Sequence, residues 1–159
     1  MAFKVFISHS TSDLGPVFQF KYWLEINGIQ TYVAELSPQL GTELPHKIAN
    51  AIDSSDCLIA IMTKDGDRSA WVNQEVGYAK RAGKLIVPVV EEGVALKGFL
   101  STLEHVPFRK ENPELAISKV INYLVKVKAN KEQQGILVAG LMLLFGIFAL
   151  AAIIASQKK

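Results

Sequence analysis

The carboxylate of Glu75 stands in a stretch whose spacing is typical of a helix with one apolar face. That stretch reads RSAWVNQEVGYAKRAGK over residues 68–84. At about 100° per residue, Glu75 lies roughly 40° from Trp71 and falls between Trp71 and Ala79, inside the apolar stripe. A buried carboxylate costs free energy unless it is paired, protonated or placed at a wet edge. Glu75 is therefore either a boundary residue that reaches solvent or a lysine, or a carboxylate at the rim of a cleft with Trp71 as an aromatic wall.

The elements that would position Glu75 alternate between strand and helix. Short apolar or alternating runs predict strands, and helical spacing predicts the segments between them. The predicted strands are 3–8, 29–34, 56–63, 84–90 and 105–109, and the predicted helices are 13–27, 44–54, 68–84 and 112–130. This alternation favours an α/β fold with a parallel, doubly wound, five-stranded sheet. Ligands of such sheets gather beyond the C-terminal ends of the strands.

The C-terminal segment GILVAGLMLLFGIFALAAIIA, residues 135–155, has no charge and no proline. At about 1.5 Å per residue it is long enough to cross a hydrocarbon core of roughly 30 Å. The alternative is a buried hairpin or core helix, but a chain of 159 residues has little interior to hide so many apolar residues on every side. We expect a globular domain over residues 1–130, a linker over 131–134, a transmembrane helix over 135–155 and a short basic tail over 156–159.

Charge, cysteine content and the first residues narrow the class of protein further. The net charge is +2, and residues 1–110 hold 11 basic and 12 acidic residues, so no basic stripe for nucleic acid is predicted. The lysines before the apolar segment fit anionic lipid headgroups better. The opening MAFKVFISHS lacks the pattern of a signal peptide, which predicts a cytoplasmic domain held by a C-terminal anchor. The single cysteine, Cys57, fits a reducing compartment and a core position rather than a nucleophile.

Five motifs, in order along about residues 3–128, resemble the TIR (Toll/interleukin-1 receptor) domain family. VFISHS followed by Asp13 is similar to the first box of that family, and LSPQLGTEL lies where these domains keep their BB loop. The run IANAIDSSDCLIAIMT resembles the helix and third strand that follow the loop, SAWVNQE matches the W-x-x-x-E pattern, and KLIVPVV resembles the fourth strand. The resemblance implies a flavodoxin-like doubly wound sheet of five parallel strands.

The resemblance also implies an activity, because many TIR domains cleave the nicotinamide–ribose bond of NAD+. The glutamate of W-x-x-x-E carries that activity, and here it is Glu75. The expected products are nicotinamide and ADP-ribose or a cyclic ADP-ribose, with NAD+ as substrate and with no cofactor or metal ion. A single carboxylate suits this reaction, since the cationic nicotinamide departs neutral and the transition state resembles an oxocarbenium ion. Trp71 would stack on a base or ribose, or else be a core aromatic residue.

By the same resemblance, further residues are expected to bind the substrate. Ser8, His9 and Ser10 follow the first strand and border the site in this family. His9 would contact a phosphate or ribose, or would simply be solvated; some animal members have arginines here instead. Gly41 matches a glycine of the BB loop, and Glu35 is either an acid of the site or a surface charge.

Two other functions remain open. The chain could be a non-catalytic adaptor that signals through TIR–TIR contacts, or a flavodoxin-like relative that handles nucleosides, such as a deoxyribosyltransferase. The motif order makes the second of these the weaker alternative. For an enzyme, we expect homo-oligomers formed through TIR–TIR contacts, and confinement to a membrane would raise their effective concentration.

Overall fold

The chain divides into two units, and each is described by itself. The computed structural model describes the backbone of residues 2–10, 13–33, 44–64 and 69–156, with side chains up to residue 139 except that of Leu44. Ala2–Tyr123 form the first unit and Leu124–Lys159 belong to the second. All the residues discussed below as a candidate site belong to the first unit.

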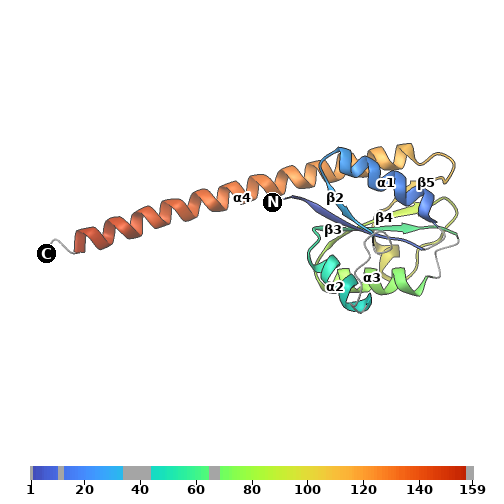
Figure 1. Ribbon diagram of the computed structural model, residues 1–159, viewed down its shortest axis with the longest axis horizontal. Helices are drawn as coiled ribbons and strands as arrows, with labels where there is room; N and C mark the ends of the chain where they lie inside the picture. The colour runs from blue at the N-terminus through green and yellow to red at the C-terminus, as the bar shows by residue number, and fades with distance from the viewer. Residues whose placement is uncertain (1, 11–12, 34–43, 65–68, 157–159) are drawn as a thin grey trace. The chain divides into compact units, whose positions relative to one another are not determined.

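The first unit is built on a five-stranded sheet (Figure 1). Its strands are β1 (Lys4–Ser8), β2 (Gln30–Tyr32), β3 (Cys57–Met62), β4 (Leu85–Glu91) and β5 (Val106–Phe108). Their order is β2-β1-β3-β4-β5, and every pairing is parallel. The predicted five-stranded parallel α/β sheet is thus confirmed, with each strand close to its expected range.

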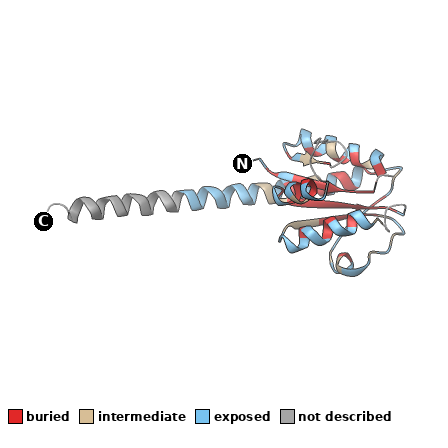
Figure 2. Cartoon of the chain, turned by 60° about the horizontal axis from the view of Figure 1, so that its bottom comes forward, coloured by how far each residue is buried: buried red, intermediate tan, exposed pale blue. Residues whose placement is uncertain are grey.

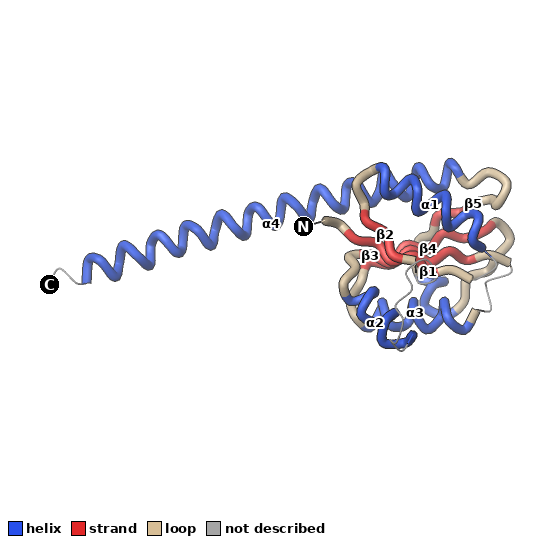
Figure 3. The backbone as a smooth tube through the Cα atoms, in the orientation of Figure 1, coloured by secondary structure: helices blue, strands red, loops and turns tan. Residues whose placement is uncertain are grey.

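Helices cover both faces of the sheet, with α2 and α3 on one side and α1 on the other (Figure 3). The helices of this unit are α1 (Leu14–Ile26), α2 (Leu44–Asp53), α3 (Ala70–Arg81) and the short 3-10 helix η3 (Gly98–Thr102), together with the first residues of α4 (Glu114–Ser156). Residues 91–104, left without a predicted element, contain η3. All six residues of β3 are buried, as expected for a strand covered on both faces (Figure 2).

Strand residues alternate between two halves of the core because successive side chains point to opposite faces. Phe6, Leu58 and Val90 face α2 and α3, where they form one cluster with Ile52 and Val76. The intervening strand residues fill the other half of the core with the apolar faces of α1 and the start of α4, namely Val17, Phe20, Leu24, Ala116, Ile117 and Val120. Packing on both faces of the sheet therefore holds the strands in place, and it also positions the residues at the strand ends.

Local sequence explains where α3 begins and ends. The side chain of Ser69 accepts a hydrogen bond from the backbone N–H of Val72, at 3.4 Å, and so caps the helix. Lys80 and Arg81 lie in its last turn, where positive charge complements the helix dipole. Gly83, with φ of +66°, then takes the left-handed conformation that turns the chain into β4.

Helix α4 is longer than the sequence predicted. It runs without interruption from Glu114 to Ser156, so residues 131–134, expected as a linker, are helical. Among the side chains described, which end at residue 139, no helix is both long and apolar enough to cross a membrane. Ile136, Leu137 and Val138 are exposed, and most of the expected span of 135–155 lies beyond these side chains.

Cys57 is a buried residue of β3, and its chemistry should reflect this. Burial first, and the charge of Asp56 second, raise the pKa of the Cys57 thiol. Because only the thiolate is nucleophilic, we expect iodoacetamide at about pH 8 to leave Cys57 unmodified in the folded protein and to alkylate it fully in denaturant. Mass spectrometry after timed quenching measures this. Equal labelling rates in the two states would contradict the observed packing of β3.

Candidate functional site

The candidate site lies where the strand order reverses, at the C-terminal ends of β1 and β3. The chain leaves β1 toward β2 on one side and later continues into β3 on the other. In open α/β sheets, ligands bind at such a reversal of strand order. Ser8, the last residue of β1, is paired with Ala60 of β3. Ser8, His9 and Ser10, all predicted to border a site, are buried at this edge.

Glu75 reaches the end of β1 from α3. Its exposed fraction is 8%, and the Ser8 hydroxyl donates a hydrogen bond to its Oε2. Glu75 therefore does not reach open solvent, and that part of the boundary interpretation is wrong. A hydroxyl that donates to a carboxylate favours the charged form and offsets part of the cost of burial. The structure therefore places one carboxylate of α3 at the C-terminal end of β1, where the Ser8 hydroxyl orients it.

Trp71 and Glu75 line the same cavity, between α2 and α3. This cavity, called here the Glu75 cavity, has a volume of about 150 Å³ and is lined by Pro45, Ile48, Ala49, Trp71, Gln74, Glu75 and Tyr78. Trp71 is 53% exposed, so the alternative that it is a core aromatic residue is wrong. It stands as a wall of the cavity one helical turn before the carboxylate.

His9 and Ser10 are buried directly after Ser8 and are not among the residues that line the Glu75 cavity. His9 is 6% exposed, so it is not a solvated loop residue. Its Nδ1–H donates to the carbonyl oxygen of Ser10 at 2.6 Å, and the N–H of Asp13 donates to the same oxygen at 3.0 Å. Glu35 and Gly41, also predicted to bind substrate, lie in residues 34–43, outside the described part of the chain.

Among the α3 residues that line the Glu75 cavity, Gln74 and Tyr78 were not predicted as site residues. They lie three and seven positions after Trp71 and so share its helix face, a spacing that could have indicated them. The Tyr78 hydroxyl donates to Oδ2 of Asp53 at 2.8 Å, and this hydrogen bond raises the pKa of Tyr78. The carbonyl oxygen of Asp53 accepts in turn from Lys84 Nζ at 2.6 Å.

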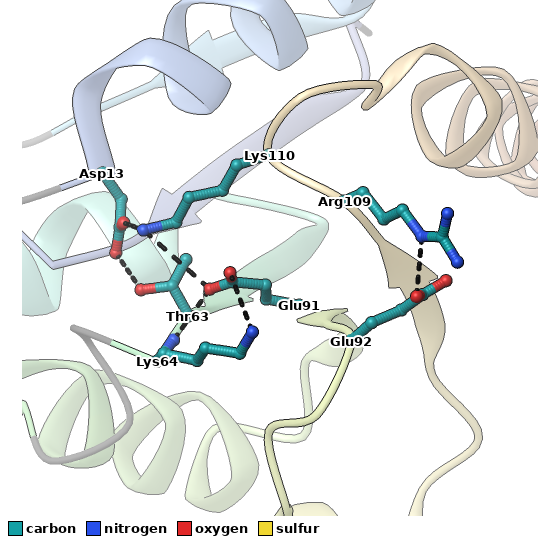
Figure 4. A network of polar contacts seen from close by, with 7 residues as sticks. All are labelled: Asp13, Thr63, Lys64, Glu91, Glu92, Arg109 and Lys110. Carbon is teal, nitrogen blue, oxygen red and sulfur yellow. Dashed lines mark hydrogen bonds and ion pairs between the residues drawn. The ribbon is translucent and has the colours of Figure 1, made fainter.

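A polar network joins the segment after β1 to the ends of β3, β4 and β5 (Figure 4). The side chain of Asp13 is fully buried; its Oδ2 accepts from the Thr63 hydroxyl at 2.6 Å, and its Oδ1 lies 3.2 Å from Lys110 Nζ. Lys110 Nζ also lies 3.9 Å from Glu91 Oε2, which accepts from the backbone N–H of Lys64 at 2.9 Å. Among the described residues, carboxylates alternate with ammonium groups in this network, which ties the segment after β1 to the segments after β3 and β5.

A larger cavity of about 310 Å³ lies between α1 and the start of α4. Glu114 is the one ionisable residue among those that line it, which are Trp23, Asn27, Glu114, Ile117, Ser118, Ile121 and Asn122. The Glu75 cavity is smaller, but it combines two aromatic side chains with a buried carboxylate that is hydrogen-bonded to the last residue of β1. It is the better candidate site.

Comparison with known proteins agrees with this architecture. A model of the TIR domain family matches residues 5–121. This chain belongs to the TIR domain family. The match covers the five strands except for Lys4 of β1, and it includes all the residues that line the Glu75 cavity and the network around Asp13. No curated protein matches the sequence.

Solved structures with similar folds include TIR domains and one N-glycosidase, all at low sequence identity. The TIR domain of the Toll-related receptor TRR-2 from Hydra magnipapillata is 18% identical, with a TM-score of 0.66 over 77% of this chain and 97% of that one. The RPS4 and RRS1 TIR domain heterodimer is 14% identical, with a TM-score of 0.55 over 78% and 96%. The CMP N-glycosidase BcmB of Clostridium botulinum is 16% identical, with a TM-score of 0.53 over 74% and 97%.

Proposed function

We propose that this TIR domain cleaves the N-glycosidic bond between nicotinamide and ribose in NAD+, with Glu75 as the catalytic carboxylate. The observation that carries the proposal is the placement of Glu75: it is buried, it accepts from Ser8, and it lines a cavity with the exposed ring of Trp71. The W-x-x-x-E resemblance supports the same residue. So does the existence of an N-glycosidase with this fold in Clostridium botulinum.

The chemistry requires little more than an oriented negative charge. As the bond from ribose C1′ to the pyridinium nitrogen breaks, its electron pair leaves with nicotinamide, which becomes neutral without a general acid. Positive charge then develops at C1′ and the ring oxygen, and a fixed carboxylate stabilises it in a partly dry site. Water that attacks C1′ and releases a proton gives ADP-ribose; attack by a group of the adenine gives a cyclic product instead.

Ser8 is better placed to orient Glu75 than to touch the substrate. Its exposed fraction is 1%, and its hydroxyl is committed to Glu75 Oε2. Trp71 supplies the surface on which a planar ring stacks. Substrate contacts by His9, Ser10, Glu35 and Gly41 remain expectations drawn from the family resemblance.

The test is direct. Full-length protein reconstituted at high density in lipid vesicles is given NAD+, and nicotinamide and the second product are followed by chromatography and mass. The proposal expects nicotinamide in equal amount to ADP-ribose or a cyclic isomer. Intact NAD+ after incubation with folded, assembled protein would favour the adaptor function.

The adaptor function is a second candidate because α1 presents an apolar stripe. Leu14, Phe18, Tyr22 and Ile26 recur every four residues and are all at least 40% exposed. Such a stripe on a helix is typical of protein–protein contacts. The TIR domains of RPS4 and RRS1 form a heterodimer, which supports association as a function of this fold. An adaptor would associate through such a surface without consuming NAD+.

The proposal includes a membrane anchor formed by residues 135–155, with the TIR domain in the cytoplasm. Confinement to a surface raises effective concentration, so removal of residues 135–159 should lower specific activity at low protein concentration. Attaching the truncated protein to vesicles by an engineered tag should restore that activity. Equal specific activity of full-length and truncated protein at every concentration would contradict the role given to this segment.

A further inference from the structure

Helix α1 presents a row of large apolar side chains on its outer side. Leu14, Phe18, Tyr22 and Ile26 recur every four residues and are between 40% and 60% exposed; together they are called here the α1 ridge. The inner side of the helix is anchored in the core by three fully buried residues, Val17, Phe20 and Leu24. Because these residues hold α1 in place, the α1 ridge offers a fixed shape to a partner.

The charges of α1 argue against several classes of partner. Lys21 and Glu25 are the two charged residues of the helix, and they form an ion pair with each other. The Thr31 hydroxyl also donates to Glu25 Oε1 at 2.6 Å. An anionic lipid surface or a nucleic acid would require an excess of basic side chains beside the apolar ones. The α1 ridge has no such excess, so it fits a partner surface that is itself apolar and neutral.

The spacing of the α1 ridge matches a common way in which two helices pack. Side chains four residues apart form a row inclined to the helix axis, and two such rows interdigitate when the helices cross at about −50°. Gly15 and Gln19 belong to the next row and are exposed, and a Cβ atom at Gly15 would meet no atom within 4 Å. A second α1 supplies the same row and the same open space, so this surface is complementary to itself.

A cavity beside the C-terminal end of α1 adds to this complementarity. It is the cavity of about 310 Å³ described above, with Trp23 and Asn27 on the α1 side. The Trp23 ring contacts Tyr22 edge-on, with 5.6 Å between the ring centroids, so this wall adjoins the α1 ridge. In an antiparallel pair of α1 helices, the N-terminal end of each ridge, at Leu14, lies toward the cavity of the other copy.

The exposed apolar area is enough for a weak but specific contact. The four side chains of the α1 ridge and Trp23 are each about half-exposed and together offer roughly 500 Å² per copy. A standard interface buries about 800 Å² per partner, so exposed neighbours such as Gln19 and Asn27 must contribute the remainder. We expect a contact of this size to form at high local concentration and to dissociate on dilution.

We propose that the α1 ridge is a self-association surface, on which a second copy of this chain packs its own α1 in an antiparallel sense about a two-fold axis. The Glu75 cavity lies between α2 and α3, on the opposite face of the sheet from α1, so pairing leaves both cavities open (Figure 3). A two-fold contact closes with two copies. This inference adds the partner and the geometry of the contact, and it does not depend on the proposed catalysis.

Site-specific crosslinking of the full-length protein tests the proposal. Gln19→Cys places a thiol beside the α1 ridge and near the two-fold axis, and Asn73→Cys places one on the exposed side of α3 as the matched control. The natural cysteine, Cys57, is buried. Each variant is treated with a short bismaleimide linker in mild detergent over a range of protein concentrations. Gln19→Cys should give covalent dimers whose fraction rises with concentration, whereas Asn73→Cys should stay monomeric.

A second change in the Gln19→Cys background tests the role of the ridge itself. Phe18→Glu places an unpaired charge in the apolar contact from both copies and should weaken the dimer at least about tenfold. Phe18→Leu keeps the ridge apolar and should stay within about threefold. Circular dichroism confirms that each variant is folded. Should Phe18→Glu not fold, Tyr22→Glu, at the most exposed position of the ridge, should show the same loss.

The possible results separate this contact from its alternatives. Dimers of Gln19→Cys that are lost with Phe18→Glu would support the proposal, whether or not the protein cleaves NAD+. Equal crosslinking of Gln19→Cys and Asn73→Cys, or none at any concentration, would overturn it. In a mixture of the two variants, crosslinks that join Gln19→Cys only to Asn73→Cys would show a head-to-tail contact and overturn the two-fold arrangement. A monomeric Gln19→Cys that vesicles protect from a soluble maleimide would assign the ridge to lipid and also overturn the proposal.

Discussion

Glu75→Gln is expected to lower kcat/KM for NAD+ by at least about 100-fold, the scale of losing one oriented electrostatic group from an active site. Glutamine has nearly the same shape, and its amide oxygen still accepts from the Ser8 hydroxyl, so the cavity keeps its form. What disappears is the negative charge that opposes positive charge at ribose C1′. Initial rates of nicotinamide release, with protein reconstituted in vesicles, measure the effect.

Gln74 provides the matched control for this change. It directly precedes Glu75 in α3, its side chain is exposed, and it lines the same cavity without a charge. Gln74→Asn alters the lining by one methylene and should leave kcat within about threefold, since no charge is lost. Similar losses in Glu75→Gln and Gln74→Asn would show that the cavity is sensitive to shape, and would remove the special role of Glu75.

Lys110→Met is expected to lower the free energy of unfolding by about 3 kcal/mol, because it leaves the carboxylate of Asp13 buried without its cation. Asp13 has a fully buried side chain, and Lys110 Nζ lies 3.2 Å from its Oδ1. The Thr63 hydroxyl still donates to Oδ2, which keeps the loss at the lower end of the range for broken buried pairs. Urea unfolding followed by circular dichroism measures the change.

The neighbouring ion pair is the control for Lys110→Met. Arg109 Nε lies 2.7 Å from Glu92 Oε2, but both side chains are mostly exposed, so Arg109→Met should change stability little (Figure 4). The double variant Asp13→Leu/Lys110→Met removes the buried carboxylate together with its partly exposed cation and should be more stable than Lys110→Met alone. Equal effects of Lys110→Met and Arg109→Met would contradict the role given to the buried pair.

The sequence predicted the sheet because its strands carry a strong local signal. The unbroken apolar run of β3 indicated a strand covered on both faces, and alternation with helical segments indicated parallel pairing. The length of α4 was missed, since its first turns and the apolar tail were treated as separate elements. No residue between them breaks a helix, and that signal was present in residues 131–134.

The site was predicted only in part, because its contacts are tertiary. Spacing placed Glu75 within an apolar stripe but could not indicate that Ser8, on a different element, would donate to it. Trp71 lies at the edge of that stripe, so its burial depends on how closely α2 packs against it. In the structure its ring stays exposed. The ion pair between Asp13 and Lys110 could not be predicted, because the two residues lie on loops that are far apart in the sequence.

The central claim, that Glu75 makes this TIR domain an NAD+-cleaving enzyme, is tested most directly by one measurement. Nicotinamide released from NAD+ is quantified over time for wild-type protein and Glu75→Gln, assembled at equal density on vesicles and matched in thermal unfolding midpoint. Release by the wild type, with at most about one hundredth of its rate in Glu75→Gln, is the predicted result. No release from the wild type, or equal release from both, would contradict the claim.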